Sequence, residues 1–232
     1  MTGPDRTIVA DRTIVADRTN VAGRTIVLAG ATSATGLALA TALIAAGATV
    51  IATGRSVDRL APLREAGARV EVADATSLDD MTGLADCVGP VDAVIPLVGG
   101  WRGGGGLAGQ SDEDLGALLP ALDAVRATSR AFDRALQASD AGRFAIVSST
   151  AVARPLAGGA NYAAVKAASE AWTRAVAHGF AKTSRDAGTP LRAASVVFRV
   201  KAVDPASLEQ AVLALWDQDA ADLNDSIRTL ES

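Results

Sequence analysis

The chain has few of the side chains on which metal sites, disulfides and charge-relay hydrolases depend. Its 232 residues include one cysteine, Cys87, and one histidine, His178. A single cysteine excludes an internal disulfide framework and a multi-cysteine metal site. A single histidine argues against a histidine-rich metal centre or a serine–histidine hydrolase. We therefore expect no metal, and we interpret Cys87 as a small core residue and His178 as a packing or surface residue.

Strong charge of one sign and long hydrophobic runs are also lacking. The formal net charge is -4, which gives no reason to expect nucleic acid or anionic lipid as a partner. No apolar run has membrane length, and no basic segment followed by an apolar one marks a signal peptide. The sequence favours a cytoplasmic protein that acts on a small molecule, with no nucleic-acid or membrane partner.

A six-residue repeat occupies the N-terminus. Asp5–Ala22 reads DRTIVA twice and then DRTNVA, and the related Gly23–Leu28 leads into a glycine-containing turn. The period is too short for a solenoid. We interpret residues 1–22 as a flexible or loosely docked extension that arose by slipped duplication of the first strand, and residues 23–232 as one domain. The alternative is that the extra copies pair as strands at a sheet edge or between subunits.

Fully apolar strands alternate with helical patterns after the repeats. This alternation predicts a parallel sheet buried on both faces, in a single α/β domain of the doubly wound Rossmann type. Such a sheet binds ligands at the carboxyl ends of its strands. The expected strands are Thr25–Ala29, Thr49–Thr53, Val70–Ala73, Ala93–Val98, Phe144–Val147 and Ala193–Val200. The expected helices are Leu37–Ala46, Val57–Ala66, Leu78–Cys87, Asp112–Ala138, Tyr162–Ala187 and Pro205–Asp217.

A small-residue turn joins the first strand to the first helix. Free backbone N–H groups and the helix dipole at such a junction favour a phosphate. Gly30 permits the turn, and Gly36 permits close packing of helix on sheet. The alternative is a structural turn in an α/β fold that binds no nucleotide. The candidate cofactor residues here are Gly30, Thr32, Ser33, Thr35 and Gly36.

The second strand is followed by Arg55, and its end carries no Asp or Glu. An arginine at this place suits the 2′-phosphate of NADP, whereas a carboxylate suits the ribose hydroxyls of NAD. The sequence therefore favours NADP(H) over NAD(H). The alternative is a solvated surface arginine.

Tyr162 and Lys166 are four residues apart at the start of a predicted helix, so they share one helix face. A nearby ammonium lowers the pKa of a phenol toward the range that proton transfer at neutral pH requires. Ser149 follows a buried strand thirteen residues earlier, where its hydroxyl could hold a carbonyl that faces the phenol. Together the three predict a site that handles a proton beside a carbonyl.

The segment Ile146–Ala168 resembles the active-site region of short-chain dehydrogenases/reductases. The resemblance rests on Ser148-Ser149, Gly158-Gly159-Ala160-Asn161-Tyr162 and Lys166-Ala167-Ala168, and it extends from about Arg24 to Leu230. It implies that Tyr162 is the general acid in reduction. It further implies that Lys166 binds the nicotinamide ribose and lowers the tyrosine pKa, and that Ser149 orients the carbonyl.

Other expectations follow from the same resemblance. Asp74 matches the family's adenine-contacting aspartate after the third strand, and Val98 and Gly99 after the fourth strand lie on the cofactor side. The family commonly packs its two long helices across two-fold axes, so we expect a homodimer or homotetramer.

Several family positions differ in this chain. Ala29 and Ala34 replace a threonine and a glycine of the usual phosphate loop T-G-x-x-x-G-x-G, and the usual active-site asparagine, expected near Ala121 or Leu122, has no counterpart. Phe198-Arg199 stands where the family has Pro-Gly after the sixth strand, which weakens the expected carboxamide contact. The connection to the last helix is short, so we expect an open substrate site.

The glycine-rich stretch after the fourth strand, Val98–Gly106, is similar to the glycine–glycine–tryptophan stretch of dihydropteridine reductases. Trp101 could stack on a flat substrate, and Arg102 could meet an anion. The alternative is a flexible glycine loop with a partly buried tryptophan.

The sequence therefore favours an NADPH-dependent oxidoreductase, a ketoreductase that acts on the ketone, quinone or conjugated carbonyl of a small metabolite. One alternative is a repurposed enzyme of the same fold that performs an isomerisation, dehydration or rearrangement without net redox change. Another is a non-catalytic NADP-binding sensor.

Overall fold

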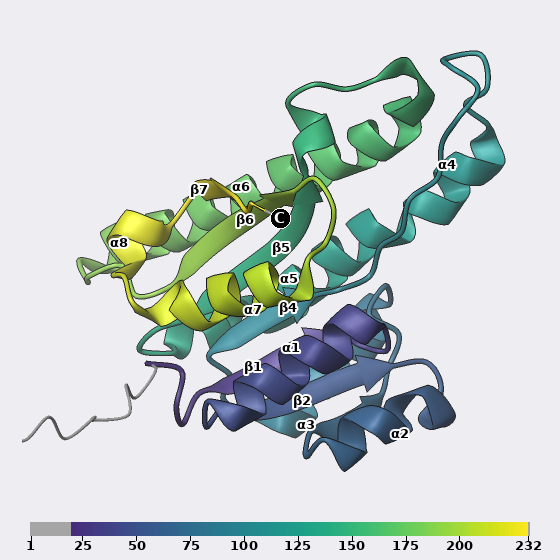
Figure 1. The fold of residues 1–232 in the computed structure, drawn as a ribbon. Helices are drawn as coiled ribbons and strands as arrows, with labels where there is room; N and C mark the ends of the chain where they lie inside the picture. Colours follow the sequence, from purple (N-terminus) through teal and green to yellow (C-terminus); the bar gives the residue numbers. More distant parts are fainter. Residues whose placement is uncertain (1–19, 232) are drawn as a thin grey trace, which may run out of the picture.

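The computed structural model describes residues 20–231, which form one seven-stranded parallel sheet with helices on both faces (Figure 1). The strand order is β3-β2-β1-β4-β5-β6-β7. The strands are β1 (Thr25–Ala29), β2 (Thr49–Gly54), β3 (Arg69–Val72), β4 (Ala93–Pro96), β5 (Arg143–Ser149), β6 (Ala194–Val200) and β7 (Ser226–Thr229). The helices are α1 (Ala34–Ala45), α2 (Val57–Glu65), α3 (Leu78–Val88), α4 (Asp112–Leu118), α5 (Pro120–Ala138), α6 (Ala160–Ala187), α7 (Pro205–Leu213) and α8 (Ala220–Leu223). Short 3₁₀ turns span Thr150–Val152, Ala157–Gly159 and Ala214–Trp216.

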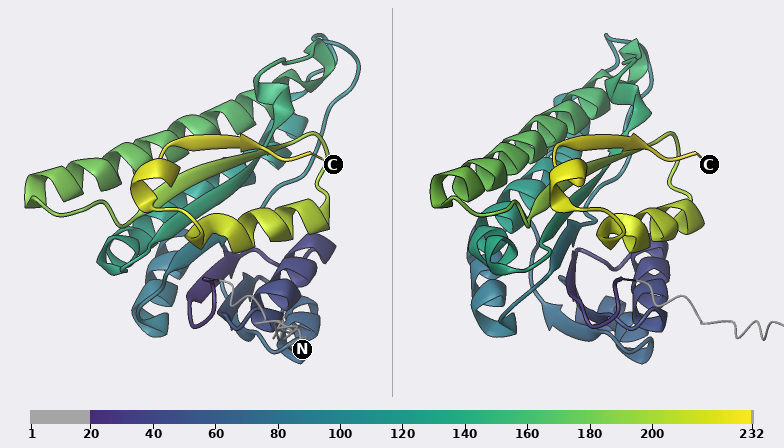
Figure 2. Two further views of the ribbon diagram at one scale, coloured as in Figure 1. Left: turned by 60° about the vertical axis from the view of Figure 1, so that its left-hand side comes forward. Right: turned by 90° about the vertical axis from the view of Figure 1, so that its left-hand side faces the viewer.

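Each face of the sheet carries its own apolar core. One core packs α1, α2 and α7 against the sheet, and the other packs α3, α5 and α6 against the opposite face. Figure 2 shows the long helix α6 on the far side of the sheet from α7. Burial on both faces explains why the central strands are apolar throughout rather than alternating. The predicted Rossmann-type fold is confirmed.

The strand order reverses at β1, which pairs with both β2 and β4. The loops that follow β1 and β4 therefore diverge to opposite faces and leave a crevice at the carboxyl end of the sheet. The expected strand ends lie within one or two residues of those observed. The reversal of strand order at β1 therefore determines where a ligand can enter.

The predicted continuous helix Asp112–Ala138 is wrong, because the helix breaks into α4 and α5 at Leu119. Pro120 has no N–H to donate and starts α5 at its first position, where a proline is tolerated. The last predicted helix also ends as a 3₁₀ turn after Leu213, and neither α8 nor β7 was predicted.

Most of the N-terminal repeat, residues 1–19, lies outside the described residues. The described end of the repeat includes Val21, whose side chain is fully buried in the core that contains α1. Asn20 donates a hydrogen bond to Asp217. The boundary between residues 22 and 23 stays a prediction. Within residues 20–231, no helix has the length and apolarity to cross a membrane.

Candidate active site

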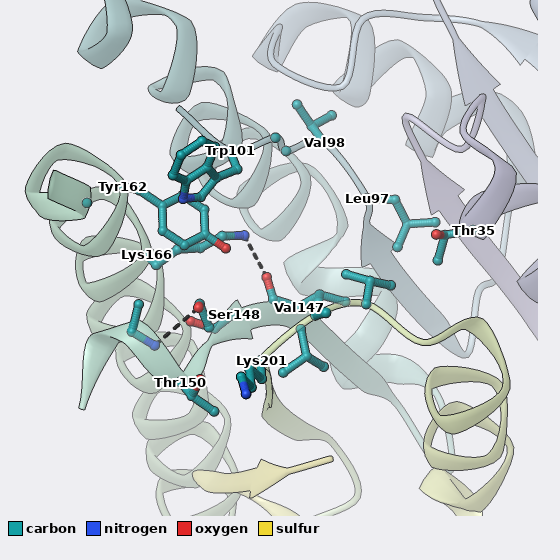
Figure 3. Close-up of a pocket in the computed structure, with 18 of the residues that line it drawn as sticks. Thr35, Leu97, Val98, Trp101, Val147, Ser148, Thr150, Tyr162, Lys166 and Lys201 are labelled. Atoms are coloured by element: carbon teal, nitrogen blue, oxygen red, sulfur yellow. Dashed lines mark hydrogen bonds between the residues drawn. The ribbon is translucent and has the colours of Figure 1, made fainter. Parts of the chain in front are cut away.

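A cavity of about 1200 Å³ opens at the carboxyl ends of β4, β5 and β6. Figure 3 shows Thr35 and Leu97 toward one end and Trp101, Tyr162 and Lys166 toward the other. The predicted site residues that line it are Ser33, Thr35, Val98, Gly99, Trp101, Ser149, Tyr162 and Lys166. The predicted site residues outside its lining are Gly30, Thr32, Gly36, Arg55, Asp74 and Arg102.

The turn between β1 and α1, where the sequence predicts a phosphate site, is tightly packed. Gly30 has φ +76°, and a Cβ atom there would lie 2.6 Å from a methyl group of Val98. A Cβ atom on Gly36 would lie 2.1 Å from the carbonyl oxygen of Ala31. Ser33 caps α1 by accepting from the Gly36 N–H at 3.1 Å. Neither glycine has room for a side chain, and Ser33 and Thr35 at the start of α1 line the cavity, where free backbone N–H groups favour a phosphate.

Two arginines follow β2 beside this turn, Arg55 directly after the strand and Arg59 in α2. The Arg55 guanidinium lies 3.9 Å from the Asp74 carboxylate, so the two predicted adenosine-side residues share one edge of the sheet. Arg59, in the first turn of α2, donates to the carbonyl oxygen of Thr32 at 3.4 Å. Sequence reasoning missed Arg59, although its spacing of four from Arg55 was a signal. Thr32 is thus bound to Arg59 and does not line the cavity.

The opposite end of the cavity holds the predicted catalytic group. The Lys166 ammonium lies 5.9 Å from the centre of the Tyr162 ring and donates to the Val147 carbonyl oxygen at 2.8 Å. Ser149 is buried at the end of β5, and its Oγ accepts from the Ala151 N–H at 3.1 Å. Its hydroxyl proton is therefore free to point at a carbonyl in the cavity. β5 and α6 thus place the three side chains in the lining of one cavity.

Burial lowers the pKa of Lys166 to about 8, and the carboxylate of Glu170 one turn along α6 opposes this decrease. An ammonium that is poorly solvated is more easily deprotonated, because desolvation penalises the charged form. Lys166 therefore changes charge within a range of pH at which an enzyme can be assayed.

Apolar side chains occupy the position where the family has an asparagine. Ala121 is buried in a small cluster with Leu118 and Val165, against which Leu122 and Tyr162 pack. The lysine ammonium is anchored directly on β5. The structure therefore has hydrocarbon side chains where the resemblance places the asparagine.

A buried polar network lies behind the lysine. Glu170 is 4 % exposed, and both of its oxygens accept from Arg199 on β6, at 2.9 and 2.6 Å. Ser148 on β5 donates to the same carboxylate at 2.6 Å, and Ser148 pairs in register with Arg199. Sequence reasoning treated Arg199 only as a replacement for glycine and missed Glu170. The charge of Arg199 inside the otherwise apolar strand β6 was the signal for a buried partner.

The segment after β4 is tied to the segment that precedes α6. Gly104 N–H donates to the Gly158 carbonyl at 2.7 Å, and the Gln110 amide donates to Gly158 and Gly104 carbonyls at 3.1 Å each. The Gln110 oxygen accepts from the Asn161 N–H, next to Tyr162. Gln110 thus clamps the glycine-rich loop, and sequence reasoning missed it. Trp101 lines the cavity but is 61 % exposed.

Arg102 lies outside the cavity lining, exposed, with a hydrogen bond to the Trp101 carbonyl. Cys87 is exposed and accepts a hydrogen bond from Arg69, so the expectation of a core cysteine is wrong. His178 is exposed on α6. Among the described residues, no group of three or more His, Cys, Asp or Glu side chains could hold a metal ion.

The crevice at the reversal of strand order, the glycine turn before α1 and the tyrosine–lysine pair are together typical of a dinucleotide-dependent α/β oxidoreductase. The chain belongs to the short-chain dehydrogenase family, whose model matches residues 24–185. No curated protein matches the sequence significantly.

Solved structures with the same fold have low sequence identity to this chain. A short-chain dehydrogenase from Salmonella enterica superposes with TM-score 0.80 and 18% identity, covering 93% of this chain and 98% of that one. A short-chain dehydrogenase/reductase from Mycobacterium ulcerans has TM-score 0.76 and 18% identity, with coverage of 90% and 88%. A Shigella flexneri protein solved in complex with NADP has TM-score 0.77 and 19% identity, with coverage of 91% and 98%.

Proposed function

We propose that this chain is an NADPH-dependent reductase of a ketone, quinone or conjugated carbonyl in a small metabolite. The observation that carries the proposal is that Ser149, Tyr162 and Lys166 line the same cavity as Ser33 and Thr35 at the first turn of α1. A dinucleotide with its phosphates at α1 has the length to bring its reactive ring beside the phenol.

The chain's own residues supply the proton and the orientation. When bound, NADPH supplies a hydride that reduces the carbonyl carbon. Ser149 donates a hydrogen bond to the carbonyl oxygen, and Tyr162 transfers its phenolic proton to that oxygen to form the alcohol. Solvent then reprotonates the phenolate. Lys166, whose ammonium lies 5.9 Å from the phenol ring centre, stabilises the phenolate until then.

The preference for NADPH over NADH is supported by the two cations at the end of β2. Arg55 and Arg59 are exposed and suited to a 2′-phosphate. The test is a fluorescence titration with both nucleotides on wild type, Arg55→Ala and Arg59→Ala. The exposed Arg64→Ala, on the same helix, is the control. We expect each of the first two variants to weaken NADPH binding selectively. Equal weakening of NADH binding would overturn the preference.

A non-redox rearrangement is the second candidate, because the altered surroundings of Lys166 favour a changed proton path. Its ammonium donates to the Val147 carbonyl, and hydrocarbon fills the asparagine position. Net NADPH oxidation with a panel of carbonyl compounds, lost in Tyr162→Phe, supports reduction. Product formation without oxidation supports the second candidate. Cofactor binding without turnover of any kind would instead indicate a sensor.

We also propose that the protein is a homodimer or homotetramer assembled through α5 and α6. A shallow groove of about 460 Å³ crosses the two helices and is lined by Ser129, Arg130, Trp172 and Val176, among others. Trp172 donates to Ser129 and is covered by the Arg126 guanidinium. Light scattering on the purified chain tests the assembly, and a monomer would contradict it.

A further inference from the structure

The mouth of the cavity exposes a group of large apolar side chains. Trp101, Leu156 and Val203 are 61, 71 and 47 % exposed, and all three line this one cavity. They come from three different segments, after β4, before α6 and after β6. Exposed apolar side chains around one concave site favour a ligand that covers them. The ligand therefore has a hydrophobic body.

The charges of the same cavity are all positive. Its ionisable lining consists of Arg154, Lys166 and Lys201 besides Tyr162, and no Asp or Glu is among the described residues that line it. Lys166 is already bound to the β5 backbone. Within residues 20–231, neither Arg154 nor Lys201 has a carboxylate within ion-pair distance. Two cations are thus available to a ligand.

The position of Arg154 assigns it to the substrate rather than to the cofactor phosphates. Thr35, in the first turn of α1 where the cofactor phosphates are expected, lies at the opposite end of the cavity from Tyr162 (Figure 3). Arg154 lies in the segment between Ser149 and Tyr162, and Gly158 of that segment is hydrogen-bonded to the Trp101 loop. Arg154 and Trp101 therefore stand on two segments that Gln110 holds together.

We propose that the substrate is an amphiphilic carboxylate, with a flat or alicyclic body against Trp101 and a carboxylate bound by Arg154. The inference deepens the proposed reductase function and rests on it for the reaction. The guanidinium fork matches a carboxylate with two parallel hydrogen bonds, so one free arginine is sufficient for recognition. The carbonyl to be reduced lies between the two contacts, facing Tyr162.

A binding experiment tests the carboxylate site without requiring turnover. The probes are 2-naphthoate and its neutral analogue 2-naphthamide, titrated by calorimetry into the full chain with and without NADPH. We expect naphthoate to bind roughly tenfold more tightly than naphthamide, and Arg154→Gln to remove that difference. Trp101→Ala should weaken both probes. The exposed Arg185→Gln, in the last turn of α6 and outside the lining, is the matched control and should change neither. Equal binding of the two probes to wild type would overturn the proposal.

A turnover experiment separates this inference from the proposed function. The paired substrates are 4-acetylbenzoate and 4-acetylbenzamide, compared by kcat/KM for NADPH oxidation. Reduction that favours the acid in wild type but not in Arg154→Gln supports both the carboxylate site and the reductase function. Equal reduction of acid and amide overturns the carboxylate site and leaves the reductase intact. Discrimination in binding with no oxidation of NADPH supports the carboxylate site and counts against the reductase.

Discussion

Two charged side chains one turn apart on α6 have opposite surroundings. Glu170 accepts three hydrogen bonds, two from Arg199 and one from Ser148, and is almost fully buried. Lys166 donates one hydrogen bond to the Val147 carbonyl and lines the cavity. An ammonium has three donors, so Lys166 retains capacity for a ligand whereas Glu170 has a charged partner that satisfies it.

This difference indicates two roles: Glu170 holds α6 on the sheet, and Lys166 takes part in the proposed reaction. Arg199 and Ser148 sit side by side on β6 and β5, and their shared contact with Glu170 fixes α6 on the sheet at the level of the lysine. The lysine is thereby carried to the cavity on a rigid support, with its pKa already lowered by burial. The two groups should consequently respond differently to substitution.

The largest expected effect is the loss of turnover in Lys166→Met. Removing the ammonium beside the phenol should decrease kcat by about 10²- to 10⁴-fold, the usual contribution of acid–base groups. The methionine fills the same space, so the free energy of unfolding should change little or increase. Steady-state kinetics measures kcat, and chemical denaturation measures the free energy of unfolding. The control is Lys182→Met on the exposed face of the same helix, where Lys182 pairs with Asp186. Unchanged kcat in Lys166→Met would remove the lysine from the mechanism.

Sequence patterns predicted the strands well, because apolar runs such as those of β1 and β6 are buried on both faces. They failed for β7, a four-residue strand that alternates between partly buried and exposed positions and depends on pairing with β6. β7 depends on tertiary contacts. The side chain of Asn224, which lies just before β7, accepts a hydrogen bond from the Ser195 N–H of β6. The strand propensity of a local sequence does not depend on such a distant contact and so cannot predict it.

The candidate site was predictable where spacing along one element brings groups together. Tyr162 and Lys166 share a turn of α6, and Ser149 ends a strand. Gln110 and Arg199 were missed because their partners, Gly158 and Glu170, lie tens of residues away in sequence. Only the fold makes those pairs neighbours.

An intermediate effect is expected for Glu170→Gln, and it should appear mainly as a loss of stability. Breaking a buried pair costs 3–5 kcal/mol, and because the Arg199 side chain remains 21% exposed we expect about 3 kcal/mol. Urea denaturation measures the change. The matched control is Asp225→Asn, which breaks the exposed pair between Arg174 and Asp225 and should cost less than about 1 kcal/mol. Equal costs in the two variants would show that burial of the network does not determine its contribution.

The smallest expected effect is a dependence of cofactor affinity on pH. The pKa of Lys166 is about 8, so the ammonium predominates below that pH and the neutral amine above it. A charge-assisted hydrogen bond is roughly twice as strong as a neutral one, so NADPH affinity should decrease by about 1 kcal/mol, or roughly fivefold, as pH rises through 8. Binding of the anionic cofactor favours the charged lysine, and proton uptake should accompany it near this pH.

Glu170 offers a way to move that transition, since its carboxylate raises the lysine pKa. Glu170→Gln removes the negative charge, and the midpoint of the affinity change should shift to lower pH, whereas in Lys166→Met it should vanish. NADPH titrations between pH 6.5 and pH 9.5, in buffers of different ionisation enthalpy, measure the midpoint and the proton uptake together. If the midpoint stays at the same pH in Glu170→Gln, the two side chains are not electrostatically coupled, and the glutamate acts on the lysine only by fixing the helix.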